Sequence, residues 1–329
     1  MDLEARLRAF AAVARRRSFS AAARELRISQ PAVSKHVADI ERRLGVRLVE
    51  RRARGGELTA AGAFLADYVL RAEALLAQAA RGVTEFRQPP TGSLTIAASG
   101  VPATYLLPEV AIAFQRAHPG VRVSIVSAPS AQTMDTLRAH RAEFGVVGGF
   151  AAAPEIEAEP LVEEEIVVVG PPRYAGRRLS RRDAEAATWI VPREGAAFRA
   201  AVEAAWADLG ITPAHRLELP TVEGVKLAVA RGDGVAGFSR FAVEEELRRG
   251  SLALLRLRGW NVRRTISIVR PRGGVLTPSA REFVAMLRAR WSRAPALAQR
   301  RGTRRRPRAS GQPRHAQGRS GPVSKAGGA

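Results

Sequence analysis

Three helical segments separated by very short breaks occupy the first forty-five residues, and this spacing constrains the fold more than any other feature. The apolar positions of the first segment recur at helical intervals: Leu3, Leu7, Phe10 and Val13. They predict an amphipathic helix over residues 2–16. A second short helix is expected over residues 21–26, with Ser18 or Ser20 as its N-cap.

The third segment contains clear start and stop signals. Pro31 suits the first position of a helix, with Gln30 just outside it, and Gly45 favours a left-handed terminator after Leu44. The predicted buried stripe is Val33, Val37, Ile40 and Leu44. The predicted outward positions are Gln30, Ser34, Lys35 and Asp39. Two short helices joined by a tight turn, the second with a polar start, predict a helix-turn-helix.

A basic, glycine-rich loop follows the third segment. Residues 46–49 and 57–59 are expected to form two strands, and residues 50–56 contain Arg51, Arg52 and Arg54 between them. This arrangement predicts a wing, so residues 1–60 are interpreted as a winged helix-turn-helix domain.

The whole segment resembles the LysR-type transcriptional regulators. The matching residues are Phe10, Val13, Ser18-Phe19, Ala21-Ala22, Leu26, Ser29 to Ser34, Ile40-Glu41, Leu44-Gly45, Leu48, Arg51 and Leu58-Thr59-x-Ala61-Gly62. The family usually has Phe at the position of Val49. This difference removes some packing under the wing and affects no DNA-facing group.

The resemblance implies two sets of DNA contacts. Residues near the bases are Ser29, Gln30, Pro31, Ser34 and Lys35. Residues along the phosphates and minor groove are Arg51, Arg52 and Arg54. Taken singly, an exposed Ser or an Arg-rich loop is an ordinary solvated surface. The sixty-residue ensemble favours DNA binding.

A long apolar repeat follows the wing. Its positions are Leu65, Val69, Ala72, Leu76 and Ala79. The repeat predicts a helix over residues 61–87, and the resemblance implies that this linker helix pairs two subunits antiparallel. Residues 88–92 (Gln-Pro-Pro-Thr-Gly) predict a hinge.

Strands alternate with helices beyond the hinge, which predicts an α/β domain with a mostly parallel sheet over residues 93–291. The resemblance implies a two-lobed effector-binding fold of the periplasmic-binding-protein type 2. Lobe I is expected at about 93–162 and 268–291, and lobe II at about 163–267.

A ligand is expected between the lobes, where strands end and helices begin. Fold analogy places eight residues there: Ser99, Gly100, Thr104, Ser130, Gly149, Arg193, Thr221 and Phe238. Free N–H groups at helix starts and the charge of Arg193 favour an anionic metabolite of unknown identity as effector. The alternative is that the hydroxyl residues are only helix caps. Residues 193–199 are shorter than the related pattern and lack its hydroxyls.

Net charge is +22 and concentrates at both ends of the chain. Residues 1–60 hold 14 Arg and Lys against 7 Asp and Glu, and residues 293–329 hold 10 against none. Basic ends suit a protein that contacts phosphate, although Arg outnumbers Lys 50 to 3, a bias typical of GC-rich genomes. Residues 292–329 are interpreted as a disordered basic tail, which either binds DNA nonspecifically or has no role.

Other classes of protein are disfavoured. Cysteine is absent, the five histidines lack metal-ligand spacing, and no nucleophile motif occurs, so neither an enzyme nor a cofactor is expected. Gly232–Gly237 matches the dinucleotide pattern GxGxxG, but a helix is predicted before it and a strand after it. Glu163, Glu164 and Glu165 are interpreted as an exposed strand entrance.

The sequence therefore predicts a regulator that binds double-stranded promoter DNA as a homodimer or homotetramer, and contacts RNA polymerase if it activates. No signal peptide or membrane span is recognised, so a cytoplasmic location without membrane contact is expected. Two alternatives remain: a regulator with a vestigial, ligand-free sensor domain, and a solute-binding protein.

Overall fold

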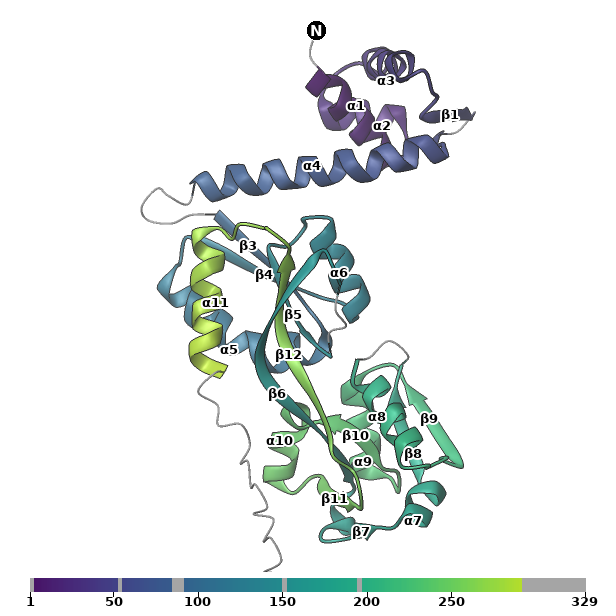
Figure 1. Cartoon of the computed structure of the whole chain (residues 1–329), viewed down its shortest axis with the longest axis vertical. Coiled ribbons are helices and arrows are strands. Elements are labelled where there is room, and N and C mark those ends of the chain that lie inside the picture. Colours follow the sequence, from purple (N-terminus) through teal and green to yellow (C-terminus); the bar gives the residue numbers. More distant parts are fainter. Residues whose placement is uncertain (1–2, 53–54, 85–91, 150–152, 194–196, 292–329) are drawn as a thin grey trace, which may run out of the picture. The chain divides into compact units, whose positions relative to one another are not determined.

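The computed structural model describes residues 3–52, 55–84, 92–149, 153–193 and 197–291. Its N-terminal part contains α1 (Leu3–Arg16), α2 (Phe19–Leu26), α3 (Gln30–Leu44) and the antiparallel strands β1 (Val49–Arg52) and β2 (Gly55–Leu58) (Figure 1). Ser18 caps α2 by accepting a hydrogen bond from the Ala21 N–H at 3.3 Å, and Gly45 ends α3 with φ of +68°. The predicted winged helix-turn-helix is confirmed.

Two side chains of α3 lie opposite to their predicted faces. Leu44 is 53% exposed, because the last residue of the helix extends past the core that Val33 and Val37 enter. Asp39 is buried, because its carboxylate accepts a hydrogen bond from Arg42 at 2.9 Å and lies 3.8 Å from the Arg6 guanidinium. Burial of a charge is tolerated where opposite charges compensate it.

The long helix α4 (Ala60–Thr84) starts from a tightly packed turn. Thr59 caps it, since its hydroxyl oxygen accepts from the Gly62 N–H at 3.0 Å and its O–H donates to the Arg47 carbonyl at 2.7 Å. A Cβ added at Gly62 would lie 1.9 Å from the Leu48 carbonyl oxygen. Glycine at this position therefore lets the helix approach the chain that enters the wing.

The first lobe of the C-terminal domain is built on three parallel strands. β3 (Gly92–Ala98) lies between β4 (Val121–Ser127) and β5 (Phe144–Gly148). A π-helical turn, η1 (Pro102–Leu106), leads into α5 (Leu107–Ala117). Side chains of α5 and α11 (Pro278–Trp291) belong to one hydrophobic cluster, whereas α6 (Ser130–Arg138) contributes Met134 and Leu137 to another.

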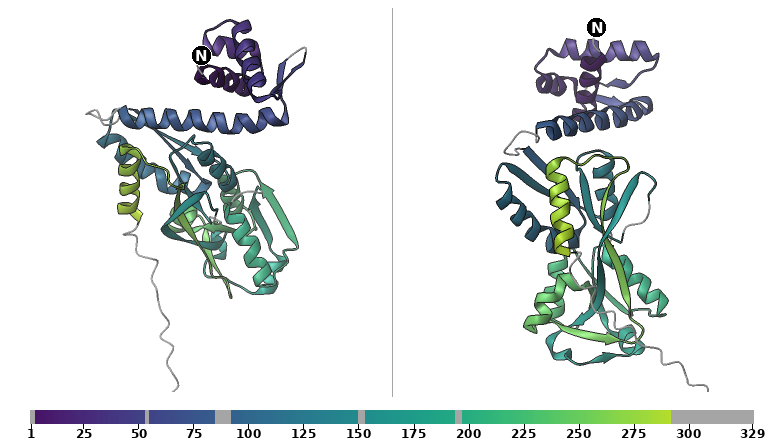
Figure 2. Two further views of the ribbon diagram at one scale, coloured as in Figure 1. Left: turned by 45° about the horizontal axis from the view of Figure 1, so that its top comes forward. Right: turned by 60° about the vertical axis from the view of Figure 1, so that its left-hand side comes forward.

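Two long antiparallel strands, β6 (Ile156–Gly170) and β12 (Val262–Pro271), connect the lobes (Figures 1 and 2). β12 pairs with β5 of the first lobe, while β6 pairs with β10 (Ala236–Ser239) and β11 (Ala253–Leu257) of the second. The remaining elements of the second lobe are η2 (Pro172–Tyr174), β7 (Arg178–Leu179), α7 (Arg181–Ala186), β8 (Thr188–Pro192), α8 (Ala197–Asp208), β9 (His215–Leu219), α9 (Val222–Arg231) and α10 (Arg240–Arg249). The predicted two-lobed fold is confirmed.

Sequence reasoning missed five elements of the second lobe, namely η2, β7, α7, α10 and β11. The order around Gly232 agrees with the prediction, because α9 precedes the glycines and β10 follows them. The predicted basic tail, residues 85–87 of the predicted linker helix and residues 88–91 of the predicted hinge lie outside the described residues, and Gly92 begins β3 instead of belonging to a hinge. In the described part of the chain, no helix combines the length and the apolar character needed to cross a bilayer.

Candidate functional site

The start of α3 presents a polar face to solvent. Ser29 caps the helix by accepting a hydrogen bond from the Ala32 N–H at 3.3 Å. Gln30, Pro31 and Lys35 are exposed, and the Gln30 Nε2 donates to the half-buried Ser34 Oγ at 3.4 Å. Val33 and Val37, on the opposite face, are buried in the core. The helix therefore offers amide, hydroxyl and ammonium groups, which are able to read base edges in a major groove.

The wing is fixed to the helices by a close glycine contact. A Cβ at Gly56 would lie 3.0 Å both from the Phe19 ring and from Val49 Cγ1, and the Gly56 N–H donates to the Arg17 carbonyl at 3.1 Å. Val49 is buried beneath the wing.

The predicted phosphate-binding arginines belong to this wing. Arg51 and Arg52 lie in β1, with Arg51 paired opposite Gly56. Arg54 lies outside the described residues.

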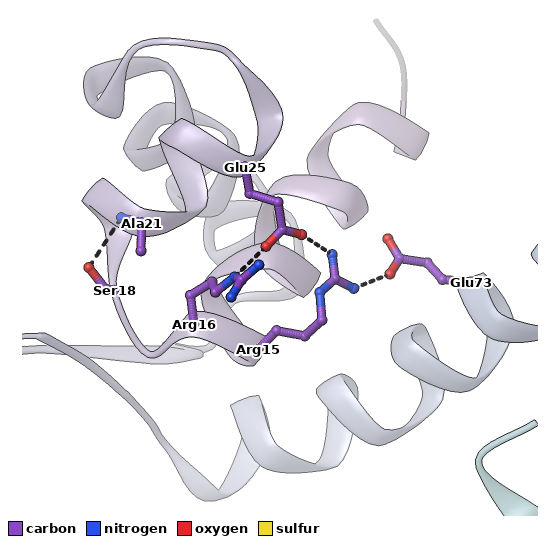
Figure 3. A network of polar contacts seen from close by, with 6 residues as sticks. All are labelled: Arg15, Arg16, Ser18, Ala21, Glu25 and Glu73. Carbon is purple, nitrogen blue, oxygen red and sulfur yellow. Dashed lines mark hydrogen bonds and ion pairs between the residues drawn. The ribbon is translucent and has the colours of Figure 1, made fainter. Parts of the chain in front are cut away.

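A network of ion pairs joins α1, α2 and α4 (Figure 3). Glu25 of α2 accepts from Arg15 at 2.7 Å and from Arg16 at 2.6 Å, and Arg15 also donates to Glu73 of α4 at 2.5 Å. Hydrogen bonds from Arg16 and then Arg15 hold the pKa of Glu25 below its ordinary value. The network thus joins the long helix α4 to two helices of the N-terminal domain.

Between the lobes lies a cavity of about 280 Å³. Four of the predicted effector residues line it: Ser99, Gly100, Ser130 and Arg193. Ser99 follows β3, Gly100 opens the helical turn before η1, and Ser130 opens α6. Amide groups in a first helical turn have no carbonyl partner four residues earlier, so these starts supply hydrogen-bond donors.

Ser99 has a structural role that sequence reasoning did not anticipate. Its side chain is buried, and its Oγ accepts a hydrogen bond from the Gly148 N–H at 3.2 Å, which links the ends of β3 and β5. Its own N–H donates to the Val146 carbonyl at 3.0 Å. The Ser99 hydroxyl therefore keeps its hydrogen and one lone pair for a ligand.

The other four predicted residues occupy different surroundings and are not among the described residues that line this cavity. Thr104 is exposed within η1. The Gly149 N–H donates to the Thr265 carbonyl at 3.0 Å, and Thr221 caps α9 through the Gly224 N–H. Phe238 is buried in β10 with its ring centroid 5.9 Å from that of Phe198.

A buried ion pair beside the cavity was missed from the sequence. Arg264 of β12 lines the cavity, and its Nε donates to Glu164 of β6. The Glu164 side chain is 0% exposed, so its interpretation as part of an exposed strand entrance was wrong. The alternation of Glu163, Glu164 and Glu165 along β6 could have indicated that one of the three points inward.

The electrostatic character of the cavity is one-sided. Its charged lining residues within the described chain are Arg193 and Arg264, and no Asp or Glu is among them. The described residues contain no cluster of three or more His, Asp or Glu able to hold a metal ion.

The fold and these two surfaces define a class: a winged helix-turn-helix protein with a two-lobed ligand-binding domain. Comparison with known proteins agrees with this class. Residues 5–63 match the profile of the bacterial regulatory helix-turn-helix protein of the lysR family, and residues 87–292 match the LysR substrate binding domain. The chain therefore belongs to the LysR family of DNA-binding transcriptional regulators with an effector-binding domain.

One relative supports this assignment, and two solved structures share the fold. The chain is 32% identical over 292 residues to a RuBisCO operon transcriptional regulator of Allochromatium vinosum. This alignment covers 86% of the present chain and 96% of the relative. Full-length CbnR complexed with its target DNA has a TM-score of 0.62 at 24% identity, covering 88% of this chain and 99% of CbnR. The Synechocystis CcmR regulatory domain in complex with 2-PG has a TM-score of 0.57 at 21% identity. The match covers 62% of the present chain and 99% of the CcmR domain. These three proteins are named as regulators or as a regulatory domain.

Proposed function

We propose that this regulator binds a small anionic effector between its lobes and promoter DNA through α3 and the wing. The proposed domains are residues 1–60 for DNA, 61–87 for dimerisation, 88–91 as a hinge and 92–291 for the effector. The protein acts as a homodimer or homotetramer, because two half-sites read together multiply specificity. As an activator it would also contact RNA polymerase.

The observation that carries the effector proposal is the one-sided chemistry of the cavity. Its lining combines arginine with hydroxyl groups and helix starts, and the described lining residues include no carboxylate. Donors without competing acceptors favour an anion. The DNA proposal rests on the exposed Gln30 and Lys35 at the start of α3, together with the arginines of the wing.

Gly100 provides a clean test of the cavity. A Cβ added there meets nothing within 4 Å and Gly100 lines the cavity, so Gly100→Leu is chosen to place a larger side chain at the cavity wall. Ser99→Ala is a poorer test, because it also removes the hydrogen bond to Gly148. Ala113→Leu on the exposed face of α5 serves as the matched control.

Thermal-shift screening and calorimetry should begin with 2-PG, the ligand named for the CcmR domain, and continue through small carboxylates and phosphates. Gly100→Leu is expected to abolish binding of any hit, while Ala113→Leu binds as the wild type does. Both variants should retain the gel shift of the DNA upstream of the regulator's own gene. A hit that binds Gly100→Leu normally would place the effector elsewhere. A wild type that binds no metabolite would favour the vestigial sensor.

A further inference from the structure

The guanidinium of Arg264 has a donor left over after its ion pair is made. Its side chain is 9% exposed, and Nε is engaged by Glu164. Nη1 is buried and has no hydrogen-bond partner among the residues that the structure describes. Arg264 lines the cavity between the lobes, so a charged guanidinium with one unused donor borders the space where a ligand would bind.

A second unused polar group lines the same cavity. The Oγ of Ser130, at the first residue of α6, is buried and likewise lacks a partner in the described part of the chain. An arginine only donates, and a hydroxyl is able to donate. A ligand group that only accepts hydrogen bonds would therefore suit either of them. Buried polar groups left without a partner are costly, so a group that accepts hydrogen bonds from these donors is favourable. Glu164 Oε1 is also buried without a partner in the described chain, and it requires a donor instead.

The backbone around Arg264 holds its head in place. A Cβ added at Gly148 would lie 3.1 Å from Arg264 Cζ, so the guanidinium lies against the end of β5 on one side and is paired with Glu164 on the other. Arg264 and Glu164 are direct partners in the β6–β12 register, on the strands that join the lobes. Glu164 is thus a positioning residue for the arginine.

We propose that Arg264 is the main anion-binding residue of the effector cavity, with Ser130 as its partner and Glu164 holding the guanidinium in position. The ligand class is a compact oxyanion, either a carboxylate or a phosphate group, because a cavity of about 280 Å³ holds only a small metabolite. This assignment rests on the proposed effector cavity and adds the residue and the ligand chemistry to it.

The test uses the full-length protein and a double substitution. Arg264→Gln alone would leave Glu164 buried and unpaired and could unfold the domain. Combining Glu164→Gln with Arg264→Gln replaces the ion pair by two neutral amides. The matched control is Glu157→Gln with Arg270→Gln, because this pair joins the same two strands at 2.9 Å but is partly exposed.

Three probes are titrated by calorimetry at constant ionic strength: glycerol 3-phosphate, succinate and neutral glycerol. At least one of the two anions should bind the wild type and the control pair, and the Glu164→Gln/Arg264→Gln variant should bind it about tenfold or more weakly. Melting temperature and DNA gel shift should remain close to those of the wild type. Phosphate or carboxylate preference identifies the source of the oxyanion, and either preference supports the proposal.

Other results overturn it. If the double variant keeps wild-type affinity while Gly100→Leu abolishes binding, the cavity stands and the role of Arg264 is wrong. If neither change affects binding, both the cavity and the arginine are wrong. If glycerol binds as well as the anions, or if neither anion binds the wild type, the oxyanion class is refuted, and the DNA gel shift still reports on the regulator itself.

Discussion

Gly62 is the position at which two physical effects predict opposite outcomes. Replacing a helical glycine by alanine ordinarily stabilises a helix by about 1 kcal/mol. Here the new Cβ would lie 1.9 Å from the Leu48 carbonyl oxygen, whereas ordinary contact begins at 3.4 Å. The Leu48 carbonyl is itself held by the Thr59 N–H at 3.0 Å, and the Leu48 side chain is buried. The overlap should cost roughly 3 kcal/mol, the upper end for overpacking, so Gly62→Ala should destabilise the N-terminal domain by about 2 kcal/mol net.

Hydrogen exchange in full-length protein measures this change locally. Gly62→Ala should accelerate exchange at β1, β2 and the first turn of α4, and weaken DNA binding, while the sheet of the C-terminal domain exchanges as in the wild type. Ala63→Gly is the matched control, because Ala63 is exposed and its loss should cost only about 1 kcal/mol of helix propensity. If Gly62→Ala exchanged as slowly as the wild type or more slowly, the close approach of position 62 to the Leu48 carbonyl would not be what requires glycine.

Three further predictions concern the DNA-binding part. Gln30→Ala should weaken specific DNA binding by roughly 1–3 kcal/mol and leave binding to random DNA nearly unchanged, and an equal loss on both in gel shifts would contradict base readout. Arg51→Ala should lower the salt slope of DNA affinity by about one without altering sequence preference, as measured by titrations in increasing chloride. The pKa of Glu25 in the folded protein lies below its ordinary value of 4.5. The Glu25 ion pairs therefore stabilise the folded state above pH 4.5, and this stabilisation is lost as the pH falls through the folded-state pKa. Glu25→Gln should therefore lower the melting temperature at pH 7 and converge with the wild type in acid, whereas a constant difference would refute the ion-pair explanation.

The N-terminal domain was predictable because its signals are local. Ser18, Pro31 and Gly45 each specify a helix boundary through groups within a few residues, although α3 begins at Gln30, which was predicted to lie just outside it. The burial of Asp39 was not predictable in this way, since it depends on Arg6, which belongs to another helix.

The C-terminal domain was predictable where strands are buried on both faces. β5 is entirely buried, and its sequence is an unbroken run of apolar residues and glycine. The missed helix α10 is rich in Arg and Glu, so its apolar stripe of Ala242 and Val243 is too short to give a periodic signal. The missed strand β7 spans only two residues.

The cavity separates what a local pattern can indicate from what it cannot. Ser99, Gly100 and Ser130 were predicted to line it because each stands where a strand or loop passes into a helix, a feature that neighbouring residues determine. Arg264 and Glu164 are 100 residues apart, and each reads in isolation as a solvated charge on a strand. Only the register of β6 against β12 places them opposite one another, and only the end of β5 closes the space around the guanidinium. Since these two strands are also the connection between the lobes, an anion held by Arg264 would bind the connection itself. Its binding energy would then act directly on the strands that set the angle between the lobes.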